Sequence, residues 1–222
     1  NGRQYCGDYA GFAQLAVEKE FPAATALFYT GCGADQNPLP RRNVELCQQY
    51  GERLAKGVID ALQQPGQPLS ATLRTSLAEI VLPFEHVLTR KEIEPSANRD
   101  DLRGRWARRL LARLDRGETF PASLPYPIRV WRLGDQLWIS LTGEVVIDYT
   151  VFCKSEFGES TWVAGYTNEM LAYIPSRRVW REGGYEGRGV YEYGIPAERW
   201  TEDVEDRIMK TVRQLVEQVQ KP

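Results

Sequence analysis

The sequence predicts an α/β protein in which a mixed β-sheet core is flanked by helices. Helix-like and strand-like apolar patterns alternate along the chain, which favours this class. Apolar residues make up 42% and charged residues 26% of the 222 residues, as in an ordinary globular protein. The sequence shows no internal repeat and no linker that would divide it. We therefore expect a single domain over residues 1–222.

Two helices and a strand are expected in the first third of the chain. A helix begins at Asp8, whose carboxylate can cap it. The compact apolar run 24–30 predicts a strand, and the Gly- and Pro-rich residues 31–40 predict a loop. Asn43 can cap a second helix, which ends at Pro65.

The middle of the chain alternates in the same way. Residues 71–82 predict one or two strands, and residues 83–97 are irregular and polar. Asn98 opens a helix that Gly117 closes, and a Pro-rich stretch follows at 121–127.

A hairpin and a further α/β segment come next. Residues 128–141 alternate around a Gly134-Asp135 turn, which is typical of a β-hairpin. Glu144 then begins a helix, and residues 160–166 form the next strand.

The last third contains a long segment without clear periodicity, followed by a helix. Residues 167–200 hold five glycines and four tyrosines. Loops of that length are usually functional or disordered, and the aromatic residues argue against disorder. Thr201 caps the last helix, which carries an apolar stripe up to Val219.

Composition limits the function classes. A net charge of −2 gives no electrostatic basis for nucleic acid as the main partner. No stretch approaches about 20 apolar residues, so we expect no transmembrane segment. His86 is the only histidine in the sequence, so this chain cannot complete a site that needs two. The four cysteines form no CxxC pair, and their disulfide pairing is left open; they are Cys6, Cys32, Cys47 and Cys153.

Glu144, Asn168 and Tyr173 are the first candidate site residues. They lie at the ends of strand-like segments, where ligands collect in α/β proteins. A carboxylate and a phenol delivered to the same edge suit a metal or catalytic site. Two plainer interpretations stay open: Glu144 is also favoured by a helix dipole, and Tyr173 could be a packed aromatic residue.

Five motifs, in order, resemble those of the neutral/alkaline (non-lysosomal) ceramidase family. They are Gly7–Ala13, Gly33–Pro38, Gly143-Glu144, Gly165–Asn168 followed by Tyr173, and Gly184–Gly187. The resemblance runs over nearly the whole chain but matches only the later half of the family's catalytic domain. It implies a partial, ceramidase-like α/β fold.

The resemblance also implies a chemistry. That family hydrolyses the amide bond of ceramide, and its zinc is held by two His, one Glu and one Tyr. By position, Glu144 and Tyr173 match the Glu and Tyr ligands. The family's two His ligands lie upstream of the region that this chain resembles. The resemblance therefore implies that zinc would take its other ligands from an upstream half of the protein, which could be a separate chain.

One departure from the family concerns the nucleophile. Asn37 stands where the family has its Ser, and an amide cannot act as a nucleophile in its place. Asp35 is then a candidate general base or partner of a ligand, and Asn37 is the second candidate residue of the catalytic pocket. Both residues also suit a turn. Asn168, Tyr185 and Arg177 are the candidate substrate-binding residues. Arg177 and Arg178 could instead pair with Glu182 and Glu186.

The leading hypothesis is a zinc-dependent hydrolase of an N-acyl, ceramide-like amide bond, in sphingolipid metabolism. The alternative is a catalytically inactive ceramidase-like module with a binding or extracellular assembly role, which Asn37 favours. A third hypothesis is hydrolysis of another N-acyl or ester substrate. The resemblance implies a lipid or N-acyl partner and a secreted, periplasmic or extracellular location.

Overall fold

A computed structural model of the chain describes residues 5–221, apart from the side chain of Glu192, and confirms the α/β class. Its residues group into two compact units. The first unit comprises residues up to 29 and 37–68, and the second comprises residues 30–36 and those from 69 onward. The expectation of a single domain stays a prediction, and each unit is described by itself.

The first unit is a pair of packed helices, α1 (Asp8–Glu20) and α2 (Val44–Leu62). Asn43 caps α2 as predicted, because its side chain accepts a hydrogen bond from the Glu45 backbone N–H at 2.7 Å. Asp8 is not the cap of α1 but its first residue, preceded by Gly7.

The predicted strand at 24–30 is wrong, since these residues adopt no regular structure. Side chains of α1 satisfy the backbone here in place of a neighbouring strand. The Ala26 N–H donates to Glu18 at 3.0 Å, and the Ala26 carbonyl accepts from Gln14 at 2.7 Å. Leu27 is 90% exposed, so the apolar run does not enter a core.

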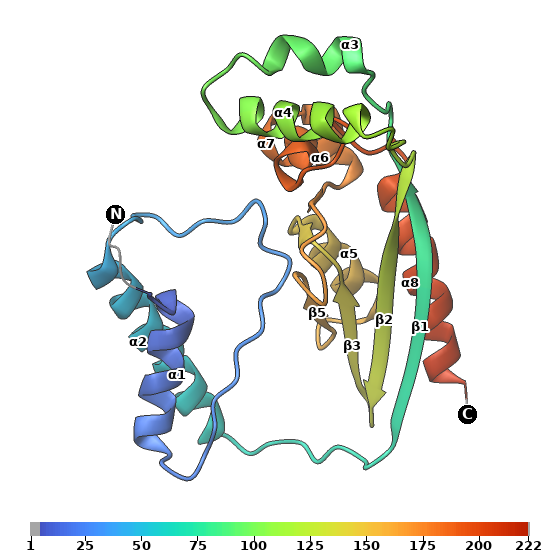
Figure 1. The fold of residues 1–222 in the computed structure, drawn as a ribbon. Helices are drawn as coiled ribbons and strands as arrows, with labels where there is room; N and C mark the ends of the chain where they lie inside the picture. The colour runs from blue at the N-terminus through green and yellow to red at the C-terminus, as the bar shows by residue number, and fades with distance from the viewer. Residues whose placement is uncertain (1–4, 222) are drawn as a thin grey trace. The chain divides into compact units, whose positions relative to one another are not determined.

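The second unit is built on a mixed sheet whose strand order is β1-β2-β3-β5 among the described residues (Figure 1). The strands are β1 (Leu73–Pro83), β2 (Ser123–Leu133), β3 (Gln136–Leu141) and β5 (Trp162–Ala164). β1, β2 and β3 are antiparallel, whereas β5 pairs with β3 in parallel. Residues 71–82, which predict one or two strands, therefore contribute to one strand, which runs from Leu73 to Pro83.

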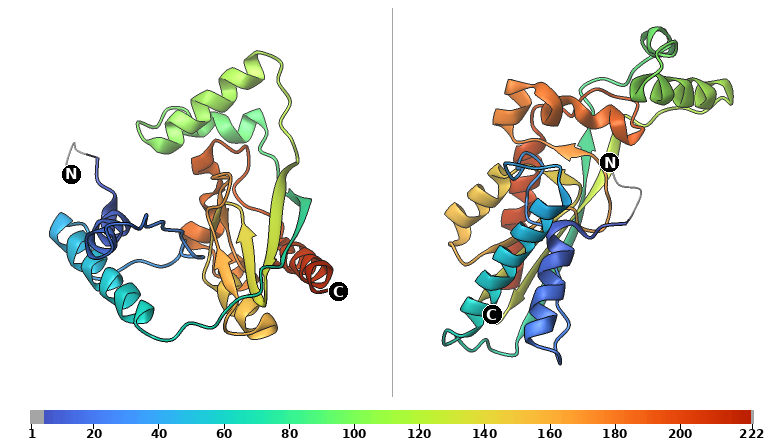
Figure 2. Two further views of the ribbon diagram at one scale, coloured as in Figure 1. Left: turned by 90° about the horizontal axis from the view of Figure 1, so that it is seen from below. Right: turned by 90° about the vertical axis from the view of Figure 1, so that its left-hand side faces the viewer.

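Helix α8 (Val204–Gln220) packs along β1 and β2, as Figures 1 and 2 show. Its apolar stripe is buried from Val204 to Val219, which confirms the predicted amphipathic helix. The helix begins later than predicted: Asp203 precedes it, and Thr201 instead donates a hydrogen bond to the Asp203 carboxylate at 2.6 Å.

The hairpin predicted at 128–141 is confirmed, with Leu133 opposite Gln136 across the turn. Most of the Pro-rich stretch before it, residues 123–127, belongs to β2, which begins at Ser123. Pro125 and Pro127 are tolerated there since that part of β2 pairs with β1 alone.

Two boundaries in the region between β1 and β2 also differ from prediction. Asp101, not Asn98, caps α4 (Leu102–Asp115) by accepting from the Gly104 N–H at 2.9 Å. The stretch 83–97 is not wholly irregular; it contains α3 (Arg90–Ile93) and the 3₁₀ turn η1 (Glu94–Ser96).

The largest correction concerns residues 144–200. Glu144 begins a strand, not a helix: β4 (Glu144–Val145) precedes α5 (Asp148–Phe157). The segment predicted as a long loop holds β6 (Tyr173–Ile174) and three short helical elements. These are α6 (Arg177–Glu182), α7 (Gly184–Arg188) and η2 (Gly189–Tyr193). β4 and β6 form a short parallel pair of their own.

Two further expectations concern cysteines and membranes. All four cysteines are free thiols, and burial raises the pKa of Cys32 to about 12. None of the helices within residues 5–221 has the length and apolar content that crossing a bilayer requires.

Candidate functional site

Glu144 and Tyr173 lie directly opposite each other in the parallel pair of β4 and β6. The Glu144 N–H donates to the Ala172 carbonyl at 2.8 Å and fixes this register. The next residues on the two strands, Val145 and Ile174, are fully buried. Because side chains alternate along a strand, Glu144 and Tyr173 share the opposite face. The structure therefore brings together the two residues that the sequence singles out.

A glycine makes this close approach of the two strands possible. Gly143 has a φ of +81°, in the left-handed region, and a Cβ there would lie 2.7 Å from the Ala172 carbonyl oxygen. Any other residue would push the strands apart beside Glu144.

Tyr173 is enclosed by aromatic neighbours and is only 9% exposed. The Tyr185 ring contacts it edge-on at a centroid distance of 5.0 Å, and the Tyr193 ring does so at 5.9 Å. Gly189 leaves space for the ring, since a Cβ there would lie 2.8 Å from Tyr173 Cδ2. Tyr185, predicted to bind substrate, is thus beside Tyr173, and it is 51% exposed.

Tyr166 is a fourth member of the site that the sequence analysis missed. Partial burial raises its pKa to about 12, with further contributions from the Glu144 charge and a hydrogen bond with Glu144. Its φ of +55° is unusual for an aromatic residue. The backbone is held there because the Tyr166 N–H donates to the Gly143 carbonyl at 2.9 Å. Its position just after β5, at the carboxyl end of a strand, is the signal that could have identified it.

The pKa of Tyr173 is also raised, first by burial and then by Tyr185 and the Glu144 carboxylate. Both phenols therefore keep their protons at neutral pH. The arrangement is a carboxylate facing two hydroxyl groups, with a partly exposed tyrosine at its side. Such a group can bind a cation or hold a polar substrate by hydrogen bonds.

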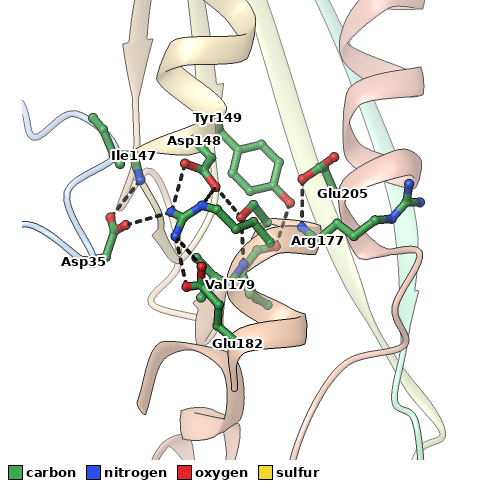
Figure 3. Close-up of polar contacts among 11 residues, drawn as sticks. Asp35, Ile147, Asp148, Tyr149, Arg177, Val179, Glu182 and Glu205 are labelled. Carbon is green, nitrogen blue, oxygen red and sulfur yellow. Dashed lines mark hydrogen bonds and ion pairs between the residues drawn. The ribbon is translucent and has the colours of Figure 1, made fainter. Parts of the chain in front are cut away.

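Asp35 lies just beyond the end of β4, where its carboxylate accepts a hydrogen bond from the Ile147 N–H at 2.8 Å (Figure 3). The neighbouring Ala34 N–H donates to the Val145 carbonyl at 3.1 Å. Asp35 therefore ties residues 30–36 to the residues that follow Glu144. Its role as a general base stays a prediction.

A polar network centred on Arg178 lies beside Asp35. The Arg178 guanidinium donates to both carboxylate oxygens of Asp148, at 3.0 and 3.1 Å, and to Glu182 at 3.0 Å (Figure 3). Ser176 also donates to Asp148. We call Asp35, Asp148, Ser176, Arg178 and Glu182 the Arg178 network.

Arg177 points to a different partner. Its guanidinium pairs with Asp206 of α8, and its backbone N–H donates to Glu205 at 2.8 Å. Of the two pairings that the sequence analysis weighed for arginines 177 and 178, Arg178 makes the one with Glu182. Substrate binding by Arg177 stays a prediction.

The two candidate asparagines are exposed. Asn37 belongs to the first unit, and Asn168 follows β5 with a φ of +65°, which Asn tolerates better than most residues. Their assigned roles stay predictions.

The donor set at Glu144 is rich in oxygen and poor in nitrogen. Within residues 5–221 no three His, Cys, Asp or Glu side chains gather in a way that could hold a metal ion. His86, the single imidazole, instead contacts the Glu92 carboxylate at 2.9 Å. Glu144 and Tyr173 alone could thus contribute only part of a metal site.

Comparison with known proteins supports the fold. No protein-family model matches the sequence, and no curated protein sequence matches it. The structure is similar to the crystal structure of neutral ceramidase from Pseudomonas aeruginosa, with a TM-score of 0.61 and 12% sequence identity. The match covers 96% of this chain and 41% of that chain. The chain thus has a ceramidase-like α/β fold and spans less than half the length of the protein it resembles.

Proposed function

We propose that this chain supplies part of the active site of a zinc-dependent hydrolase that cleaves an N-acyl, ceramide-like amide bond. The observation that carries this proposal is the register of β4 and β6, which sets Glu144 opposite Tyr173. The likeness of the fold to a neutral ceramidase supports it.

The chemistry of the donors fits half of such a centre. Glu144 would offer a carboxylate oxygen and Tyr173 a phenol oxygen, while nitrogen ligands would come from outside these 222 residues. When bound, zinc would supply a water of lowered pKa and polarise the scissile carbonyl.

The two remaining tyrosines of the site would orient the metal ligand and the substrate. The hydrogen bond between Tyr166 and Glu144 would orient the Glu144 carboxylate. Tyr185 presents a half-exposed ring against Tyr173, which suits contact with the apolar part of an N-acyl chain. With Asn37 in place of the family's Ser, attack by water is the chemistry consistent with this sequence.

Metal analysis and turnover together test the proposal. We expect the protein expressed from its complete gene to bind zinc and to hydrolyse a fluorescent N-acyl sphingosine. The Glu144→Ala variant should lose both properties, whereas Glu159→Ala, which removes an exposed carboxylate after α5, should keep them. Absence of zinc from the active wild-type protein would refute the metal mechanism.

A second candidate function is a catalytically inactive ceramidase-like module that binds a lipid or another protein. Asn37, which cannot act as a nucleophile, is the observation that favours it. Binding of the same N-acyl sphingosine without turnover would support this function. Turnover that depends on Glu144 would reject it.

A further inference from the structure

The strand pair that carries Glu144 and Tyr173 is very short. Its ladder comprises two residue pairs, Glu144 with Tyr173 and Val145 with Ile174. Two pairs define a register weakly, and a shift by one residue would turn Tyr173 toward the opposite face. Further interactions must therefore keep Glu144 and Tyr173 facing each other.

The Arg178 network lies where those interactions are needed. Asp148 follows β4 in the chain, and Arg178 follows β6. Their contact involves both carboxylate oxygens, which gives it a defined direction as well as strength. A second hydrogen bond connects the same two segments, since the Tyr149 hydroxyl donates to the Pro175 carbonyl at 3.1 Å.

Burial makes this contact different from an ordinary surface ion pair. The side chains of Asp148 and Asp35 are only 16% and 17% exposed, although Arg178 is half-exposed. Ion pairs between fully exposed side chains contribute little, whereas a partly buried, bidentate pair is less screened by water.

The network also reaches a third segment of the second unit. Arg178 Nη2 lies 3.9 Å from the Asp35 carboxylate, which itself accepts the Ile147 N–H. One guanidinium thus faces carboxylates from residues 30–36, from α5 and from its own helix α6 (Figure 3).

We propose that Arg178 is a positioning residue that holds β4 and β6 in the register that sets Glu144 opposite Tyr173. The proposal rests on the function proposed above for its catalytic consequence, but its structural part can be tested without activity. The guanidinium bonds Asp148 and Glu182, beyond the ends of the two strands, so it acts on Glu144 and Tyr173 through the backbone.

Amide hydrogen exchange, resolved at single residues, tests the structural part. The Glu144 and Val146 N–H groups donate across the strand pair, whereas the Ile139 N–H lies in the central sheet. In Arg178→Gln we expect the first two amides to exchange about tenfold faster and Ile139 to remain unchanged, since losing a charge-assisted bond has an effect of that order.

Arg181→Gln is the matched control. Arg181 lies on the same helix and pairs with Glu202, away from Asp148. Its exchange rates at Glu144 and Val146 should equal those of the wild type. Arg178→Lys keeps the charge but loses the bidentate geometry, and should give intermediate rates. If Arg178→Gln fails to fold, Arg178→Lys replaces it in the exchange test.

Steady-state kinetics with a fluorescent N-acyl sphingosine test the catalytic part. Arg178→Gln should lower kcat by about tenfold with little change in KM, because the register is altered and the substrate surface is not. Arg178→Lys should recover part of the loss.

The outcomes separate the two proposals. Equal exchange rates in Arg178→Gln and Arg181→Gln, or an unchanged kcat in an active Arg178→Gln enzyme, would overturn the positioning role. Absence of turnover in the wild-type protein expressed from its complete gene would overturn the proposed function, while the exchange rates would still decide the role of Arg178.

Discussion

Two strand pairs of the second unit differ in what determines their register. The β2–β3 hairpin is joined by a tight turn, and its inward residues Ile128, Val130, Ile139 and Leu141 are fully buried. The β4–β6 pair has two residue pairs, and its strands are separated by α5 and β5. The hairpin register follows from local pattern, whereas the register of the candidate site depends on contacts between distant residues. The site is therefore the more easily disturbed of the two.

The largest expected effect comes from the core face of the hairpin. Replacing the fully buried Ile139 by Ala should lower the free energy of unfolding by about 3–4 kcal/mol, because a cavity forms under the sheet. Urea denaturation measures this loss. An effect below about 1 kcal/mol would show that the hairpin is less central to the core than its burial indicates.

Gly143→Ala should give the next largest loss of unfolding free energy, about 3 kcal/mol. The position combines a positive φ with a close approach to the Ala172 carbonyl. Gly117 offers a matched control, because it has a φ of +80° and a Cβ there would meet no atom within 4 Å. Gly117→Ala should cost about 1 kcal/mol from backbone strain alone. Equal losses in urea denaturation would contradict the close approach of β4 and β6.

Asp148→Asn should cost about 2 kcal/mol near pH 7, because it removes charge-assisted bonds from Arg178 and Ser176. Burial acts to raise the pKa of Asp148, but these bonds outweigh it and hold the pKa below the ordinary 3.8. The ionised form thus stabilises the fold above pH 3.8, and this contribution is lost as the pH falls through the lower, folded-state pKa. The difference in free energy of unfolding between wild type and Asp148→Asn, measured by urea denaturation, should therefore decrease as the pH is lowered below 3.8.

The smallest expected effect lies on the outer face of the hairpin. Trp131 is 48% exposed and lies opposite Trp138, with ring centroids 6.4 Å apart. Trp131→Ala should cost about 0.5–1 kcal/mol in thermal or urea denaturation, as is usual for a cross-strand pair. A cost as large as that of Ile139→Ala would mean that this face is covered.

Elements whose pattern is local could be predicted from the sequence. The amphipathic stripe of α8, the Asn43 cap and the hairpin turn are of this kind, because each depends on residues a few positions apart. The prediction for the apolar run at 24–30 is wrong for the complementary reason. An extended segment becomes a strand only when a partner strand meets it, and α1 side chains take that place.

The candidate site could be predicted in part. Glu144 and Tyr173 are identifiable from the sequence, and the structure places them together. Tyr166 was missed: its position just after β5 is a signal, but its positive φ depends on a hydrogen bond to Gly143, which no local sequence pattern indicates. Of the Arg178 network, only the pairing with Glu182 could be predicted, since Asp35, Asp148 and Arg178 come from three separate segments.

The alternation within β4 has a consequence for how this segment tolerates change. Glu144 faces the tyrosines, while Val145 and Val146 are fully buried in the hydrophobic core. Adding or deleting a single residue between Gly143 and Asp148 would turn the Glu144 side chain toward the hydrophobic core or move Asp148 out of reach of Arg178. The number of residues between Gly143 and Asp148 is therefore more tightly constrained than the identity of most side chains in this segment.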